Sequence, residues 1–311
     1  MEKTKNLSNP VKKWNDHSGE QVDSVSNFDV IDCEICGFKH IIPVPTLEEV
    51  EDAYRQEYYS TEKPSYIERA KEDLDWWNLV YSERYDSFEQ LLSTNRRRIL
   101  DVGSGPGYFL LHGKQRGWET LGIEPSGQAA EHSRQLGLEI IEDFLTEKTA
   151  GQLGNFDVVH ASEVLEHISD PKGMLKLSYR LLNPGGLLCV VAPNDYNPFQ
   201  DALRGVCGYE SWWLAPPHHI NYFEVNSLSN LFADCGFAVV LREATFPIDI
   251  FCLMGDNYVG NDTMGRKCHK KRKTFEMNMA AAGYGKVKRQ LYRALAKSGL
   301  GREIMIIGCK R

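Results

Sequence analysis

The sequence predicts an α/β protein built on a mostly parallel, doubly wound sheet of about seven strands. Between residues 97 and 245, short apolar segments alternate with helical segments. Glycines follow several of these helices, and a glycine-rich turn joins the first strand of the series to a helix. Strands that alternate with helices form βαβ units, whose crossovers cover both faces of a parallel sheet.

Each element follows from its local pattern. Apolar runs mark the strands, and three- and four-residue spacing of apolar side chains marks the helices. Pro171 begins one helix, and Gly117, Gly137 and Gly236 each follow the end of another. The predicted strands are 98–102, 120–124, 139–141, 156–160, 187–191, 237–241 and 303–309, and the helices are 108–116, 127–136, 171–182 and 226–235.

The composition and the hydrophobic pattern of the chain change at three places. Residues 1 to about 30 are polar and predict a loose arm, and aromatic residues at helical spacing before residue 92 predict a helical cap. Residues 246–300 interrupt the strand–helix rhythm and predict a second cap. We therefore divide the chain into 1–92 (arm, cysteine knuckle and helical cap), 93–245 (cofactor-binding core), 246–300 (cap insertion) and 301–311 (final core strand).

Composition narrows the class of protein. The 311 residues are 42% hydrophobic and 25% charged, which is typical of a globular protein. The net charge of −7 argues against nucleic acid as a partner. No apolar run reaches the roughly 18 residues of a membrane span. We see no export signal at the start, and the eight cysteines are dilute, so we expect reduced thiols and a cytoplasmic location. The sequence carries no signal for the oligomeric state.

The most informative segment is the turn at residues 101–107, Asp-Val-Gly-Ser-Gly-Pro-Gly. Its alternating glycines let the backbone turn tightly and approach a ligand. A nucleoside triphosphate loop is excluded because the nearest Gly-to-Lys spacing, 107–114, is one residue too long and lacks the following Ser or Thr. A dinucleotide-binding fingerprint requires a third glycine at position 108. This sequence has Tyr108 there, so a dinucleotide cofactor is disfavoured.

Glu124 ends the second strand, about 20 residues downstream, where an acidic residue can bind ribose hydroxyls. The remaining ligand is a nucleoside that has a ribose but no phosphate to hold. The alternative is a tight turn with no ligand.

Four ordered motifs resemble the class I S-adenosylmethionine-dependent methyltransferases. They are the turn at 101–107, Gly-Ile-Glu-Pro-Ser at 122–126, the segment 156–167 that ends in Val-Leu-Glu-His, and Leu-Asn-Pro-Gly-Gly at 182–186. The resemblance implies a Rossmann-like fold whose last strand is antiparallel, and S-adenosylmethionine as cofactor. It is strongest for the subgroup with Val-Leu-Glu-His after the fourth strand.

The resemblance also implies roles for individual residues. The turn would border the methionine part of the cofactor, the acidic motif its ribose, the loop after the third strand its adenine, and the end of the fourth strand the region near the sulfonium. The residues concerned are Asp101, Gly103, Ser104, Gly105 and Gly107; Glu124, Pro125 and Ser126; Asp143 and Phe144; and Ala161 and Ser162.

Two histidines are candidates for a general base, since imidazole exchanges protons near neutral pH. His219, the first choice, lies in the loop after the fifth strand, with His218 and Tyr222 as supporting groups. His167 ends the Val-Leu-Glu-His motif. The competing interpretation is that both histidines only anchor loops. Trp212 and Trp213, with Trp76 and Trp77, could form an aromatic wall for the acceptor or pack in the core.

Cys33 and Cys36 form a knuckle that resembles half of a zinc ribbon, with His40 and His17 as further candidate ligands. A structural zinc ion and an ordinary turn both remain open. The basic run at 266–273 indicates either a patch for an anionic acceptor or a solvated helix face.

We therefore expect an S-adenosylmethionine-dependent methyltransferase with a small-molecule or carrier-linked acceptor, such as a sugar, methylated at oxygen. The Asn/Asp-Pro-Pro-Tyr/Phe motif of base and amide methyltransferases is missing after the fourth strand. The alternatives are an RNA methyltransferase and a non-catalytic S-adenosylmethionine-binding partner protein.

Overall fold

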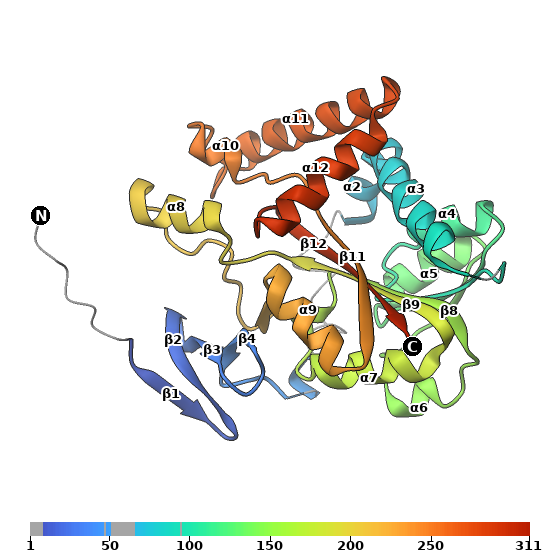
Figure 1. Ribbon diagram of the computed structural model, residues 1–311, viewed down its shortest axis with the longest axis horizontal. Helices are drawn as coiled ribbons and strands as arrows, with labels where there is room; N and C mark the ends of the chain where they lie inside the picture. Colours follow the sequence, from blue (N-terminus) through green and yellow to red (C-terminus); the bar gives the residue numbers. More distant parts are fainter. Residues whose placement is uncertain (1–8, 47, 51–65, 94) are drawn as a thin grey trace, which may run out of the picture.

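The computed structural model describes residues 9–46, 48–50, 66–93 and 95–311. Figure 1 shows a large sheet covered by helices and a smaller sheet beside it. No helix in these ranges is both long and apolar enough to span a bilayer. The strands are β1 (Val11–Trp14), β2 (His17–Val25), β3 (Phe28–Cys33), β4 (Phe38–Ile42), β5 (Arg98–Val102), β6 (Glu119–Ile123), β7 (Glu139–Ile141), β8 (Phe156–Ser162), β9 (Leu182–Pro193), β10 (Asn221–Tyr222), β11 (Phe237–Ala244) and β12 (Glu303–Lys310).

The helices agree closely with the predicted positions, and α6, α8 and α10 are additions. They are α2 (Tyr66–Glu72), α3 (Leu74–Leu91), α4 (Tyr108–Gln115), α5 (Gly127–Gln135), α6 (Glu147–Ala150), α7 (Pro171–Leu181), α8 (Pro198–Cys207), α9 (Val225–Asp234), α10 (Ile250–Leu253), α11 (Asp262–Ala281) and α12 (Gly285–Lys297), with a 3-10 turn, η2 (Leu165–His167). Residues 51–65 of the predicted helical cap lie outside the described residues.

The large sheet has the strand order β11-β12-β9-β8-β5-β6-β7. Every neighbouring pair is parallel except the two pairs made by β12. This confirms the predicted Rossmann-like sheet with its antiparallel last strand. The chain moves outwards from β5 through β6 to β7 and then returns to β8. Ligands of such sheets bind beyond the carboxyl ends of the strands at this switch in order, which is the edge formed by Val102 and Ser162.

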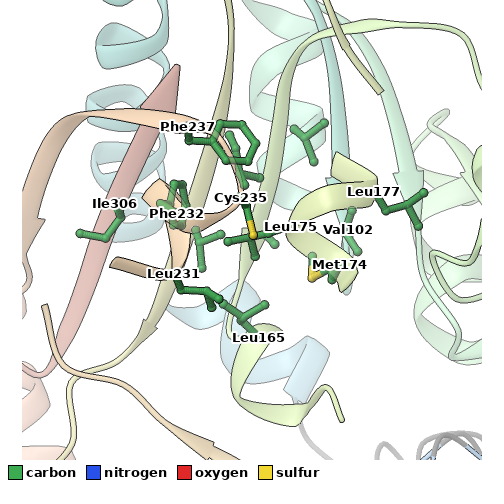
Figure 2. Packing of buried hydrophobic residues seen from close by; sticks show 14 of the residues in the cluster. Val102, Leu165, Met174, Leu175, Leu177, Leu231, Phe232, Cys235, Phe237 and Ile306 are labelled. Carbon is green, nitrogen blue, oxygen red and sulfur yellow. The ribbon is translucent and has the colours of Figure 1, made fainter. Parts of the chain in front are cut away.

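Helices bury both faces of this sheet because strand side chains alternate between the faces. On one face α7 and α9 pack Leu175 and Phe232 against the sheet, and Figure 2 shows this cluster around Val102 and Ile306. On the other face, side chains of α3, α4 and α5, such as Phe88, pack against the alternate strand positions.

The N-terminal segment corrects the prediction of a loose arm. Residues 11–42 form four antiparallel strands, and β10 completes a sheet of order β1-β2-β3-β4-β10. Asn15 and Ser26 have φ of +48° and +54° and turn the chain between β1, β2 and β3. The strands β1 and β2 are polar and largely solvent-facing, so the apolar signal that marks a strand in sequence is weak there.

The small sheet docks on the segment that precedes α9. Asn221 of β10 pairs with His40 of β4. The N–H of Ile41 donates to the carbonyl of Ile220 at 2.9 Å. Phe38 packs on Phe223 with ring centroids 5.1 Å apart. Strand β4 is therefore fixed directly beside the loop that contains the predicted catalytic histidine.

Residues 246–300 form α10, α11 and α12, and α12 lies next to α3 near the top of Figure 1. A buried ionic network joins these helices to α3 and β11. Lys288 Nζ lies 2.8 Å from Glu83 Oε2, and Arg289 Nε lies 2.9 Å from Glu243 Oε1. All of these groups except Glu83 are buried. Buried and half-buried ion pairs therefore anchor this segment to the core.

The basic run at 266–273 lies on α11, and some of its side chains contact neighbouring parts of the chain. His269 Nε2 lies 2.8 Å from Asp73 Oδ2, and Lys273 pairs with the same carboxylate. The guanidinium of Arg272 is buried and lies 4.5 Å from the ring centroid of Trp76. Arg266, Lys267, Lys270 and Lys271 are exposed, as expected of a solvated helix face, whereas Arg272 and Lys273 contact the start of α3.

Candidate functional site

The turn after β5 has a conformation that glycine adopts without strain. Gly103, Gly105 and Gly107 have φ of +68°, +52° and +81°, in the left-handed region. The N–H of Gly103 donates to the carbonyl of Ile123 at 2.8 Å, which ties the turn to the end of β6. A Cβ on Gly103 would lie 2.6 Å from Val164 Cγ2. The turn therefore needs glycine for its close approach to the segment after β8.

Glu124 follows β6, and its carboxylate faces the glycine turn. One oxygen accepts from the N–H of Gly105 at 2.7 Å, and the other accepts from the N–H of Ser126 at 2.9 Å. Burial raises the pKa of Glu124 to about 7, although both backbone donors act in the opposite direction. A carboxylate at this position can accept hydrogen bonds from two ribose hydroxyls.

Ser104 gives an independent sign that the turn holds a ligand. Its Oγ is buried and has no hydrogen-bond partner in the part of the chain that the structure describes. Buried hydroxyls in folded proteins are almost always hydrogen-bonded. A polar ligand atom would satisfy this hydroxyl, so the glycine cradle, Ser104 and Glu124 together fit a nucleoside cofactor.

Asp101 lies beneath the turn and belongs to a buried polar chain. Its Oδ1 lies 2.7 Å from His160 Nδ1, and Arg84 Nη1 lies 3.2 Å from His160 Nε2. Arginine only donates, so Nε2 accepts and Nδ1 carries the proton that is donated to Asp101. Burial lowers the pKa of His160, which keeps its imidazole neutral. Arg84 also donates to Ser162 Oγ at 3.3 Å.

Sequence reasoning missed His160 and Arg84. The available signal for His160 was a histidine in the middle of an otherwise apolar strand. Arg84 carried no signal, because only the packing of α3 on the sheet brings it to the end of β8.

The remaining predicted cofactor residues lie at the same edge of the sheet. Asp143 and Phe144 follow β7 and are half-buried, and Asp143 Oδ1 accepts from the N–H of Phe144 at 2.8 Å. Ala161 is buried at the end of β8. Pro125 is half-buried, and Ser126 caps α5 through its side chain. The fold thus brings together segments that follow β5, β6, β7 and β8.

A pair of imidazoles lies beyond β8. The rings of His167, in η2, and His219, before β10, have centroids 4.8 Å apart. His167 Nδ1 lies 2.7 Å from the carbonyl oxygen of His218 and donates to it, so Nε2 carries the lone pair. Glu166 Oε1 lies 3.7 Å from that Nε2. Ligand-type atoms of Glu166, His167 and His219 lie within 4.8 Å of one another, an arrangement that can relay a proton or hold a divalent cation.

A family model described as "Methyltransferase domain" matches residues 76–242, which is more than half of the chain. The chain belongs to this methyltransferase family. The predicted class, an S-adenosylmethionine-dependent methyltransferase, and the predicted cofactor, S-adenosylmethionine, are thereby confirmed.

Similar curated proteins match only part of the methyltransferase. The ubiquinone biosynthesis O-methyltransferase of Actinobacillus pleuropneumoniae serotype 7 is 35% identical over 102 residues, covering 30% of this chain and 44% of that protein. The protein of the same name from Ruegeria pomeroyi is 30% identical over 167 residues, covering 50% of this chain and 67% of that protein. The chain therefore spans less than half the length of the first of these relatives.

Among solved structures, a SAM-dependent methyltransferase from Archaeoglobus fulgidus superposes on the chain with a TM-score of 0.49 and 17% identity. The superposition covers 75% of this chain and 93% of that chain. A geranyl diphosphate C-methyltransferase from Streptomyces coelicolor A3(2), in complex with S-adenosyl-L-homocysteine, superposes with a TM-score of 0.47 and 11% identity, covering 74% and 77%.

A cavity of about 340 Å³ lies beside the imidazole pair of the methyltransferase. Its walls are largely apolar and come from β3, the segment that follows β4, η2 and the loop before β10. They are formed by Phe28, Pro43, Val44, Pro45, Glu49, Val50, His167, Pro217 and His218. Six of these nine lining residues therefore come from the N-terminal segment, whose small sheet the sequence did not predict.

Tyr222 contacts the His219 turn, where it was predicted as a supporting group. Its hydroxyl donates to the carbonyl of His219 at 3.1 Å, and its side chain is buried. Burial raises the pKa of this phenol further above its ordinary value. Tyr222 is therefore placed to hold the His219 turn. Trp213 packs near Tyr222 in the small-sheet cluster, whereas Trp76 packs under α11, so the tryptophans form no common wall.

Proposed function

We propose that the methyltransferase moves a methyl group from S-adenosylmethionine to a hydroxyl oxygen of a small acceptor that carries a flat ring. The observation that supports this most directly is His167. Its Nε2 lone pair is oriented by the bond from Nδ1 to the carbonyl of His218, and its side chain lines the 340 Å³ cavity. The names of the relatives from Actinobacillus and Ruegeria support oxygen as the methylated atom.

The bound cofactor supplies an activated methyl group on a sulfonium. In the proposed arrangement, Asp101 and the glycine turn border its methionine part, and Glu124 accepts from its ribose. The loop with Asp143 and Phe144 flanks the adenine, and the end of β8 lies near the sulfonium. These residues align the cofactor, and the neighbouring helices exclude water from the reacting atoms.

The acceptor occupies the cavity beside His167. Proline, valine and phenylalanine walls suit a ring better than a free sugar, whose hydroxyls would lose their hydrogen bonds to water. His167 Nε2 takes the proton from the acceptor hydroxyl, and Glu166 stabilises the resulting imidazolium. The sequence favours His219 as the general base. We favour His167, because its hydrogen bond to the carbonyl of His218 fixes which ring nitrogen carries the lone pair. His219 is the second imidazole of the relay.

Replacing His167 with alanine is expected to lower kcat by about 100-fold to 10,000-fold, the usual contribution of a general base. In the wild type, kcat at saturating cofactor should rise with pH over the range in which imidazoles lose their proton. The measurement is S-adenosylhomocysteine formation with a panel of phenols, catechols, sugars and carrier-linked acceptors.

The matched control is His112→Ala, which removes a half-buried histidine on α4 whose Nε2 lies 3.1 Å from Ser82 Oγ on α3. An unchanged pH profile in His167→Ala would contradict the assignment, and loss of the profile in His219→Ala alone would move the base to His219. Tight cofactor binding with no product from any acceptor would favour the non-catalytic alternative. Salt-sensitive RNA binding would favour the RNA alternative. The cytoplasmic location stays a prediction.

A further inference from the structure

Four side chains with metal-binding atoms meet in the small sheet. His17 begins β2, Cys33 ends β3, Cys36 lies in the turn after it, and His40 lies in the middle of β4. Their ligand-type atoms all lie within 4.8 Å of one another. The cluster is separate from the cofactor edge and from the imidazole pair, and the proposed reaction uses none of its members.

The distances within this cluster match a tetrahedral ion. His17 Nδ1 lies 3.1 Å from His40 Nε2, 3.3 Å from Cys36 Sγ and 3.7 Å from Cys33 Sγ. A tetrahedral zinc ion with bonds of about 2.0 Å to nitrogen and about 2.3 Å to sulfur holds its ligand atoms roughly 3.3–3.8 Å apart. These three distances therefore lie in or close to that range.

The orientation of His40 is set by a further contact. Its Nδ1 lies 2.9 Å from the carbonyl oxygen of Ile41 and donates to it. The proton is therefore on Nδ1, and Nε2 presents its lone pair to the cluster. A hydrogen bond from the outer ring nitrogen to a carbonyl is the usual way in which proteins orient a histidine that ligates a metal.

The backbone is also shaped for the cluster. Gly37 directly follows Cys36, has φ of +74°, and its N–H donates to the carbonyl of Cys33 at 2.8 Å, which folds the two cysteines towards one point. Gly19 pairs with Cys33 across the sheet, and a Cβ there would lie only 2.0 Å from the carbonyl oxygen of Asp32. Glycine at this position lets β2, which carries His17, lie close to β3.

We propose that His17, Cys33, Cys36 and His40 bind one structural zinc ion. Two thiolates and two imidazoles in a tetrahedron are the ligands that zinc prefers, and they select against magnesium and calcium, which require oxygen. All four positions are filled by protein, so the ion has no open site for a substrate and its role is structural.

The zinc site fixes the part of the fold that forms the acceptor cavity. His40 pairs with Asn221 through β4 and β10, and the next residue, Ile41, donates to the carbonyl of Ile220. The N–H of Ile220 in turn donates to the carbonyl of Glu166 at 2.7 Å. Zinc therefore stabilises β4 under the two histidine loops. Its influence on turnover rests on the proposed function, whereas zinc binding itself does not.

The test is the metal content of the purified full chain, measured by mass spectrometry after dialysis. We expect about one zinc ion per chain, and a fall to less than about a tenth of that in Cys33→Ser and in Cys36→Ser. The matched control is Cys207→Ser, which removes an exposed thiol on α8 and should keep the zinc. His219→Ala should also keep it, which separates this site from the imidazole pair.

A second measurement uses the wild-type chain, so it tests the proposal even if the cysteine variants fail to fold. Cobalt substituted into the wild-type chain should give the intense visible bands of a tetrahedral site and a thiolate-to-cobalt charge-transfer band. Wild-type protein that holds no zinc and gives no such spectrum would overturn the proposal, as would zinc that stays in both cysteine variants. Zinc present in a chain with no methyltransferase activity would support the site and contradict only the proposed function.

Discussion

The variant Glu124→Gln is expected to bind S-adenosylmethionine at least about 100-fold more weakly than the wild type, as measured by calorimetric titration. The carboxylate faces the glycine turn with both oxygens accepting from backbone N–H groups. A glutamine has only one acceptor oxygen, and its amide group would face a backbone donor. A hydrogen bond to a charged group contributes about 1.5–3 kcal/mol. Losing the two that the carboxylate is expected to accept from the ribose hydroxyls therefore costs more than about 2.7 kcal/mol, which corresponds to a 100-fold change in affinity.

The same carboxylate predicts a pH dependence of binding. Its pKa is raised to about 7 by burial, and only the ionised form accepts from both ribose hydroxyls. Affinity should therefore fall as the pH falls through 7, by about tenfold between pH 8 and pH 6, because about a tenth of the groups are ionised one unit below the pKa. The Glu124→Gln variant should show no such slope.

Glu119→Gln is the matched control. Glu119 begins the strand that Glu124 follows, but it is exposed and pairs with Arg98 at the opposite end of the sheet. This variant should bind cofactor as the wild type does, with the same dependence on pH. Wild-type affinity in a folded Glu124→Gln protein would show that the ribose is held elsewhere.

Replacing Glu243 with alanine is expected to lower the free energy of unfolding by about 3–5 kcal/mol, the cost of breaking a buried ion pair. Glu243 accepts from Arg289 Nε at 2.9 Å and from Arg293 Nε at 3.1 Å. Both Glu243 and Arg289 are buried. The alanine variant leaves the buried Arg289 charge without the carboxylate that accepts its hydrogen bonds. Urea denaturation followed by circular dichroism measures the change.

Two further variants test this explanation. Glu119→Ala breaks an exposed pair and should cost less than about 1 kcal/mol. Replacing Glu243 and Arg289 together with methionine should recover much of the loss, because an apolar pair of similar volume leaves no buried charge. A cost below about 1 kcal/mol for Glu243→Ala would mean that water reaches Arg289 and that the network does not anchor α12.

The sequence by itself determined the large sheet and the cofactor edge. Strand and helix positions followed from local patterns because the strands are buried and apolar and the helices end at glycines. The turn at Gly103–Gly107 and Glu124 were predicted because both requirements are local. A tight left-handed turn needs glycine, and a carboxylate must follow the next strand.

The sequence failed where an element depends on partners that are distant along the chain. The polar strand β1 pairs with β2, β2 pairs with β3, and β4 is completed by β10, about 180 residues later. The pairing of β4 with β10 brings the small sheet close to the loop that precedes β10 and to the cavity beside His167. Local hydrophobic periodicity does not indicate which distant strands pair with each other.

Only the tertiary structure decided which side chains meet. Cys33 and Cys36 were visible as a pair, and hairpin pairing placed His17 and His40 beside them. Packing of α3 brought Arg84 to His160, and η2 placed His167 against the carbonyl of His218. In each case the chemistry depends on distances of about 3 Å between atoms from different elements. Spacing along the chain cannot specify such distances, because they are set by how the sheets and helices pack.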